Sequence, residues 1–195
     1  MTIRATTMTH HPIVIAVLGA ECTGKTALAQ ALAQRLAAST SQRVTWVPER
    51  LRQWCDEHRR TPRIDEQAGI AQAQQALIAQ AGRQHDIVVC DTTAAMTAVY
   101  SEIVFGDHSL HAYAAEQQRR ADITLLTALD LPWQADGLQR DGPQVRGPVD
   151  RAIRRLLSSH GMTWSLVSGQ GGARLDSAWH AVAPLLQRAG SLQMR

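Results

Sequence analysis

The stretch that most restricts the fold of this chain is IVIAVLGAECTGKTALAQALAQRL, which covers residues 13–36. Residues 13–18 are all apolar, as expected of a β-strand that is buried on both faces. Residues 19–26 then read G-A-E-C-T-G-K-T, which matches the phosphate-loop pattern at every position. Apolar residues recur at helical spacing after this loop: Ala27, Leu28, Ala31, Leu32 and Leu36. A strand, this loop and a helix in direct succession predict a P-loop fold.

The residue types in the loop suit a bound nucleoside triphosphate. Gly19 and Gly24 allow the backbone to approach phosphate oxygens closely, so that successive N–H groups face the anion. Lys25 can reach the β and γ phosphates, and the Thr26 hydroxyl can ligate Mg²⁺. A chance glycine-rich turn would not need the full pattern between a strand and a helix. We therefore expect ATP and Mg²⁺ as cofactors, held by Gly19, Ala20, Glu21, Cys22, Thr23, Gly24, Lys25, Thr26 and Ala27.

Length and composition favour one domain around a single core. The chain has 195 residues, of which 45% are hydrophobic, and this is too short for two ordinary domains with a linker. We expect a disordered tail over residues 1–11 and one P-loop domain over residues 12–195. The net charge is +3, and the basic residues are scattered rather than clustered, so we expect no nucleic-acid partner.

The sequence also bears on location and on metal ligands. No apolar run approaches the ~20 residues that a membrane span needs, and residues 1–11 lack the apolar core of a signal peptide. Three cysteines without metal-like spacing fit reduced thiols in the cytoplasm. His108 and His111 have no cysteine or other third ligand nearby in the sequence, so we expect no metal site there. The oligomeric state is left open.

Strand and helix patterns alternate along the rest of the chain. Further strands are expected over residues 43–49, 86–91, 121–130 and 163–169, and the main helices between them over residues 51–58, 65–83, 93–105 and 110–120. This alternation predicts an α/β fold with an open parallel sheet of about five strands and helices on both faces, as in nucleoside and nucleotide kinases.

Acidic residues stand at the predicted strand ends, where a parallel sheet has its functional crevice. Asp91 follows four apolar residues, which is the pattern of a Walker B carboxylate that orients Mg²⁺ or its water. A polar strand cap is the alternative. Glu49 ends the second predicted strand and could accept the proton of an attacking hydroxyl. An ion pair with Arg50 or Arg52 would explain Glu49 equally well.

Residues beyond the last two predicted strands extend the candidate site. Asp130 ends the fourth strand, and Trp133 could stack on a flat ring, although a core tryptophan would look the same. The glycine-rich residues 168–172 predict a backbone contact to adenine through Gly169, with Arg174 stacked on the base. A flexible turn is the alternative.

Residues 131–148, LPWQADGLQRDGPQVRGP, are rich in proline and glycine. They fit either an ordinary surface loop or a lid that closes over the triphosphate. A dry site stabilises the charge that develops on the γ phosphate far better than a wet one. The lid interpretation therefore makes Arg140 and Arg146 catalytic cations.

With these segments in place, the chain resembles the ribosylnicotinamide kinase domain of the bacterial NadR-type proteins, which are P-loop nucleoside kinases in a broader AAA-like ATPase family. Four stretches carry the resemblance: GAECTGKT at 19–26, PERLRQW at 48–54, CDTTAAMTAVYSEIVFG at 90–106 and LDLPWQADGLQR at 129–140. The resemblance implies a cytoplasmic kinase that uses ATP and Mg²⁺. Its implied reaction is phosphorylation of the 5′-hydroxyl of nicotinamide riboside to nicotinamide mononucleotide in NAD biosynthesis.

The resemblance also implies roles for single residues. Lys25 and Thr26 would hold the phosphates and the metal, Asp91 would complete the metal shell, and Arg140 would act from the lid. The implied acceptor site comprises Glu49, Trp54, Asp130, Trp133 and Asp136. Arg50 stands where the family usually has an aromatic residue, which leaves the nucleoside substrate open, so a kinase of another nucleoside is one alternative. A regulatory or assembly ATPase with the same phosphate loop and Asp91 but no acceptor pocket is the other.

Overall fold

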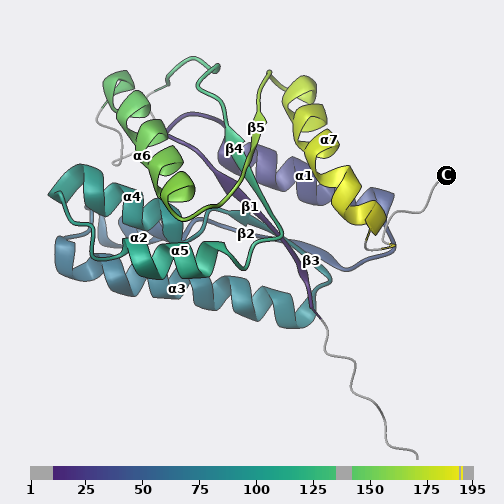
Figure 1. The fold of residues 1–195 in the computed structure, drawn as a ribbon, viewed down its shortest axis with the longest axis horizontal. Helices are drawn as coiled ribbons and strands as arrows, with labels where there is room; N and C mark the ends of the chain where they lie inside the picture. Colours follow the sequence, from purple (N-terminus) through teal and green to yellow (C-terminus); the bar gives the residue numbers. More distant parts are fainter. Residues whose placement is uncertain (1–10, 135–141, 189, 191–195) are drawn as a thin grey trace, which may run out of the picture.

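The structure is a computed structural model that describes residues 11–134, 142–188 and 190. Within these residues the chain forms a five-stranded sheet that is parallel throughout (Figure 1). In spatial order the strands are β2 (Val44–Val47), β3 (Ile87–Asp91), β1 (Ile13–Leu18), β4 (Ile123–Thr127) and β5 (Ser165–Val167). The predicted fold class is confirmed.

Helices connect the strands and cover both faces of the sheet (Figure 1). They are α1 (Lys25–Ser39), α2 (Arg50–His58), α3 (Ile64–Gln84), α4 (Ala94–Phe105), α5 (His111–Gln118), α6 (Arg146–Ser159) and α7 (Gly172–Arg188), with a 3₁₀ turn η1 (Pro143–Val145) before α6. None of the helices in the described ranges combines the length and the apolarity that a membrane crossing requires.

The apolar strands explain this layering, because successive side chains of a strand point to opposite faces. Ile15 and Val17 of β1 pack with α1 and α7 on one face. Leu18, at the end of the same strand, packs with α4 and α6 on the other face. Both faces of β1 are therefore buried, which accounts for its unbroken apolar run.

The strand ends differ from the predicted ones in a way that affects the site. β2 stops at Val47, and Glu49 is the residue that precedes α2 rather than the last residue of the strand. β4 stops at Thr127, and Ala128 N donates the last bond of the ladder to Val167 O. Asp130 therefore lies in the following loop. The predicted tail, apart from His11, falls outside the described residues.

Candidate active site

Two glycines shape the loop between β1 and α1. A Cβ atom on Gly19 would overlap the side chains of Thr127 and Thr23, so only glycine allows this close approach. Gly24 precedes α1 in the left-handed conformation, with φ of +73°, which glycine adopts without strain. These constraints account for the two glycines of the phosphate-loop pattern.

A chain of buried hydroxyl groups fastens this loop to β4. The Thr23 hydroxyl donates to Ala20 O at 2.8 Å, and Thr127 Oγ1 lies 2.7 Å from Thr23 Oγ1 and 3.2 Å from Leu18 O. Both threonines are fully buried. Thr127 was not predicted from the sequence, because a threonine in an apolar strand carries no signal of its role. It fixes the geometry of the loop through Thr23.

Lys25 and Thr26 open α1 beside Asp91, which ends β3. Lys25 Nζ donates to Ala20 O at 2.9 Å. Burial raises the pKa of Asp91 above its ordinary value, whereas a hydrogen bond from the Thr26 hydroxyl and the positive charges of Lys25 and Arg52 lower it. The predicted convergence of Lys25, Thr26 and Asp91 is present in the structure.

The surroundings of Asp91 fit a bound Mg²⁺. The side chain is 2% exposed, and Oδ1 has no hydrogen-bond partner among the described residues. A buried carboxylate oxygen without a partner is costly, and a divalent cation would remove that cost. Together, the Asp91 carboxylate and the Thr26 hydroxyl offer the oxygen ligands that Mg²⁺ prefers.

Glu49 faces the phosphate loop. Its carboxylate is buried and accepts a hydrogen bond from the Thr92 hydroxyl at 3.4 Å. Burial raises the pKa of Glu49, as does the charge of Asp91, while Lys25 and Arg52 lower it. Arg50 does not pair with Glu49, because its guanidinium binds Glu57 at 2.8 Å.

These side chains meet at a cavity of about 740 Å³ at the carboxyl ends of the strands. The phosphate loop and the start of α1 form its floor, Glu49 and Arg52 form one wall, and loop residues after β4 and β5 form the rest. The lining residues are Cys22, Thr23, Gly24, Lys25, Thr26, Ala27, Glu49, Arg52, Leu131, Pro132, Gln134, Gln170 and Gly171. Arg52 and Gln170 had no assigned role at this site before the fold was known.

A second, smaller pocket of about 150 Å³ lies on the other side of the first turn of α2. Arg52 lines the large cavity, whereas the preceding residue, Leu51, lines the small pocket. Its walls are mostly apolar and include Tyr100. Two buried oxygens on its lining residues, Glu21 Oε2 and Gln67 Oε1, have no hydrogen-bond partner in the described part of the chain. Glu21 thus lines the small pocket, and its predicted contact with the nucleotide stays a prediction.

Several predicted site residues lie away from the large cavity. Trp54 is buried between α2 and α3, where its ring stacks on His58 with 3.9 Å between centroids. Trp133 is half-buried and does not line the cavity. Arg146 is buried at the start of α6, where it donates to Leu131 O at 2.9 Å behind the cavity wall. Asp136 and Arg140 lie outside the described residues.

Asp130 and Arg174 connect the ends of β4 and β5. Arg174 is 4% exposed, forms an ion pair with Asp130 and donates to Val167 O at 3.2 Å. Gly169 N donates to the other carboxylate oxygen of Asp130 at 2.6 Å. This arrangement holds the rim of the cavity near Gln170. Stacking of Arg174 on a base stays a prediction that requires the guanidinium to leave this ion pair.

The comparison with known families agrees with the site geometry. Residues 14–174 match a family described as an AAA domain. The match begins in β1, ends in α7 and includes the phosphate loop, Asp91 and Glu49. No curated protein is similar enough in sequence to count as a relative of the chain.

Solved structures support the fold. The chain is similar to NadR protein in complex with NAD and AMP-PNP, with 20% identity and a TM-score of 0.71 over 95% of this chain and 52% of that one. It is equally similar to NadR protein in complex with NR, with 21% identity and a TM-score of 0.71 over 95% of this chain and 53% of that one. The chain thus spans about half the length of these NadR structures.

A thymidylate kinase from Ehrlichia chaffeensis shares the fold across nearly its whole length. It is 13% identical to the chain, with a TM-score of 0.58 over 89% of this chain and 98% of that one. The expected likeness to the NadR-type proteins is therefore supported at the level of the fold.

Proposed function

Because the chain belongs to the AAA domain family, we propose that it binds Mg-ATP in the large cavity and transfers the γ phosphate to a hydroxyl group of a small acceptor, which we infer to be nicotinamide riboside. The observation that carries this proposal is the position of Glu49. A nucleotide-binding loop with Asp91 would suffice for hydrolysis. A second buried carboxylate, close enough to Lys25 and Asp91 for their charges to act on its pKa, suits the activation of an acceptor hydroxyl.

The residues divide the chemistry between them. The backbone of the phosphate loop and Lys25 bind the phosphates, and Arg52 adds a second positive charge at the cavity wall. Thr26 and Asp91 would hold Mg²⁺, which when bound neutralises charge on the β and γ phosphate oxygens. The acceptor oxygen attacks the γ phosphorus and the bond to the ADP oxygen breaks. Glu49 takes the acceptor proton, for which its raised pKa makes it better matched than an ordinary carboxylate.

The small pocket suits the base of nicotinamide riboside. The nicotinamide ring is flat and, in the riboside, carries a positive charge on its ring nitrogen. Apolar walls and Tyr100 can receive a flat ring, and the unpartnered Glu21 Oε2 can compensate a positive charge. Leu51 and Arg52, neighbours in the first turn of α2, line the small pocket and the large cavity respectively, so a riboside whose base lies in the small pocket would place its 5′-hydroxyl on the side of the large cavity. The similarity to a NadR structure in complex with NR supports this choice.

A nucleoside panel tests the proposal. The protein is incubated with ATP, Mg²⁺ and one nucleoside at a time, and products are identified by mass spectrometry. We expect nicotinamide mononucleotide from nicotinamide riboside, and much less product from the uncharged nucleosides. Lys25→Ala is the matched control and should abolish product, because electrostatic stabilisation is the largest catalytic contribution. ATP hydrolysis at the same rate with and without every nucleoside would instead favour an ATPase without an acceptor.

A further inference from the structure

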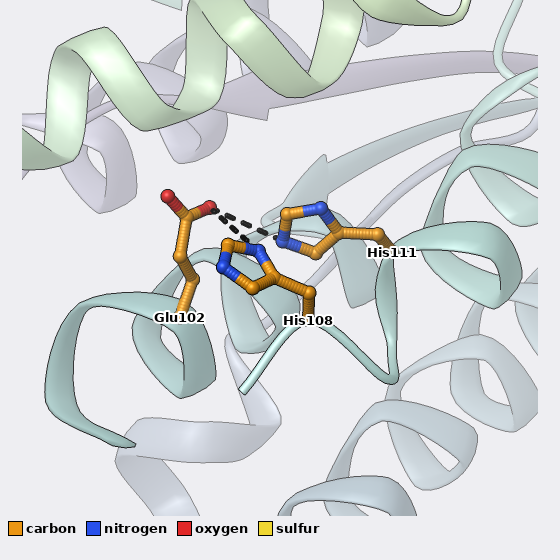
Figure 2. Close-up of side chains that lie close together, drawn as sticks. All are labelled: Glu102, His108 and His111. Atoms are coloured by element: carbon orange, nitrogen blue, oxygen red, sulfur yellow. Dashed lines mark ion pairs between the residues drawn. The ribbon is translucent and has the colours of Figure 1, made fainter. Parts of the chain in front are cut away.

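One carboxylate and two imidazoles converge outside both pockets (Figure 2). Glu102 comes from the last part of α4, His108 from the loop that follows, and His111 is the first residue of α5. Glu102 Oε2 lies 3.1 Å from His111 Nε2 and 4.0 Å from His108 Nδ1. The three potential ligand atoms all lie within 4.8 Å of one another. The expectation that His108 and His111 lack a third ligand is therefore wrong.

We propose that Glu102, His108 and His111 form a binding site for a divalent transition-metal ion of the Zn²⁺ type. Ligand bonds of about 2.0–2.2 Å in tetrahedral geometry place neighbouring ligand atoms about 3.3–3.6 Å apart. The two separations from Glu102 Oε2 lie on either side of this range, so small side-chain rotations would complete the geometry. Two imidazoles and one carboxylate form a ligand set that zinc uses, with a fourth position left for water.

The state of His111 supports a ligand role. His111 Nε2 is buried and lies 3.1 Å from Glu102 Oε2, close enough for the two side chains to share a hydrogen bond. An imidazole nitrogen and a carboxylate oxygen at this separation can instead both ligate one ion, which would replace the hydrogen bond between them.

The loop that carries His108 is held in place by its neighbour. Asp107 accepts hydrogen bonds from Ser109 N at 3.0 Å and from the Ser101 hydroxyl at 3.0 Å. The Ser101 bond ties Asp107 to α4, and the Ser109 bond closes the turn around His108, so the backbone that carries the imidazole is held near Glu102. A site that is formed in advance loses less conformational freedom when the ion binds.

A second contact orients the carboxylate. Arg155 of α6 forms an ion pair with Glu102 through Oε1, which leaves Oε2 facing the imidazoles (Figure 2). Outer hydrogen bonds of this kind fix the orientation of metal-ligating carboxylates. Within the part of the chain that the structure describes, no other group of three histidine, cysteine or acidic side chains meets the same condition.

The position of the cluster suggests what the ion would do. Glu102 directly precedes Ile103, Val104 and Phe105, which line the small pocket at the end of α4. An ion shared by Glu102 and His111 would join the end of α4 to the start of α5. It would therefore stabilise one wall of that pocket. The metal site itself rests on the three side chains and is independent of the kinase proposal.

Metal titration tests this site directly. The full chain is titrated with Zn²⁺ by calorimetry in excess Mg²⁺, and with Co²⁺ while the d–d absorption of the bound ion is recorded. We expect one equivalent to bind and the Co²⁺ spectrum to show nitrogen ligands in a four-coordinate site. Glu102→Gln, His108→Asn and His111→Asn should each weaken binding by roughly 10–100-fold or more, since even outer-shell changes have effects of this size.

Controls separate loss of the site from loss of the fold. His108 has a side chain that is 63% exposed, so His108→Asn should fold normally even if His111→Asn does not. His180→Asn changes an exposed histidine on α7 and should bind Zn²⁺ like the wild-type chain. Zn²⁺ binding that is unchanged in His108→Asn and Glu102→Gln, or no binding to the wild-type chain, would overturn the proposal.

Discussion

Replacing Glu49 by glutamine tests the division of roles at the cavity. The substitution keeps the size and the hydrogen bond from Thr92 but removes the ability to accept a proton. If Glu49 is the general base, the catalytic rate should fall by about 10²–10⁴-fold. At about 1.36 kcal/mol for each factor of ten, this corresponds to a barrier higher by about 2.7–5.4 kcal/mol. ATP affinity should change little, because Lys25 and the loop backbone bind the phosphates.

The same substitution, which should slow catalysis, should not lower the stability of the folded chain at neutral pH. Burial raises the pKa of Glu49 in the folded state, so folding favours its protonated form. The stabilisation by this group is complete below its unfolded pKa, near 4.5, and is lost as the pH rises through the higher folded value. At pH 7 Glu49→Gln should therefore be at least as stable as the wild-type chain. Near pH 4 the advantage should disappear.

The assay combines kinetics with urea unfolding at both pH values. Phosphorylation of nicotinamide riboside is measured from pH 5 to pH 9, and the wild-type rate should fall on the acidic side as Glu49 becomes protonated. Glu49→Gln should be slow at every pH and have a shallower acidic limb, because only Asp91, whose pKa is also raised, still titrates there. Glu49→Asp offers a control that retains a carboxylate on a shorter side chain. A Glu49→Gln enzyme with wild-type rate would refute the base role, and one that is less stable at pH 7 would refute the account of its burial.

Three further changes test how the site is supported. Thr127→Val should lower the free energy of unfolding by about 0.5–1.5 kcal/mol, because Thr23 loses its hydrogen bond to the Thr127 hydroxyl. ATP binding, measured by calorimetry, should weaken as well, and an unchanged ATP affinity would contradict this. Arg174→Met should lower the free energy of unfolding of the nucleotide-free chain, measured in urea, by about 1–3 kcal/mol. Loss of a fully buried ion pair would cost more, but Asp130 is partly exposed. If only ATP affinity fell, with stability intact, the base-stacking role would be favoured instead. Leu157→Ala should lower thermal stability by about 2–5 kcal/mol, since the side chain is fully buried between α6 and the sheet, and a change below 1 kcal/mol would argue against this packing.

The sequence was most informative where structure and chemistry are local. The strand, loop and helix of residues 13–36 are contiguous, so one pattern fixed both the fold class and the phosphate site. Asp91 could be placed because its strand is short, apolar and ends in the acid. Because Asp91 is the last residue of this strand, it lies at the carboxyl-end rim of the parallel sheet, where the functional crevice is expected.

Long-range placement could not be predicted in the same way. Glu21 belongs to the loop pattern, yet its side chain turns to the small pocket formed by α2 and α4. Trp54 has a flat aromatic ring that could stack on a ligand, but it packs between two helices. Glu102 and His108 are six positions apart, and only the turn after α4 brings them together. For Glu21 and Trp54 the direction of the side chain depends on other helices, and for Glu102 and His108 it depends on how the turn after α4 folds back.

The fate of the γ phosphate tests the central claim most directly. The protein is mixed with ATP labelled at the γ phosphate, Mg²⁺ and nicotinamide riboside, and the label is followed over a single turnover. The account predicts that the label appears in nicotinamide mononucleotide in step with ADP, and that Lys25→Ala transfers none. Label that appears only as inorganic phosphate, at a rate independent of the riboside, would contradict it.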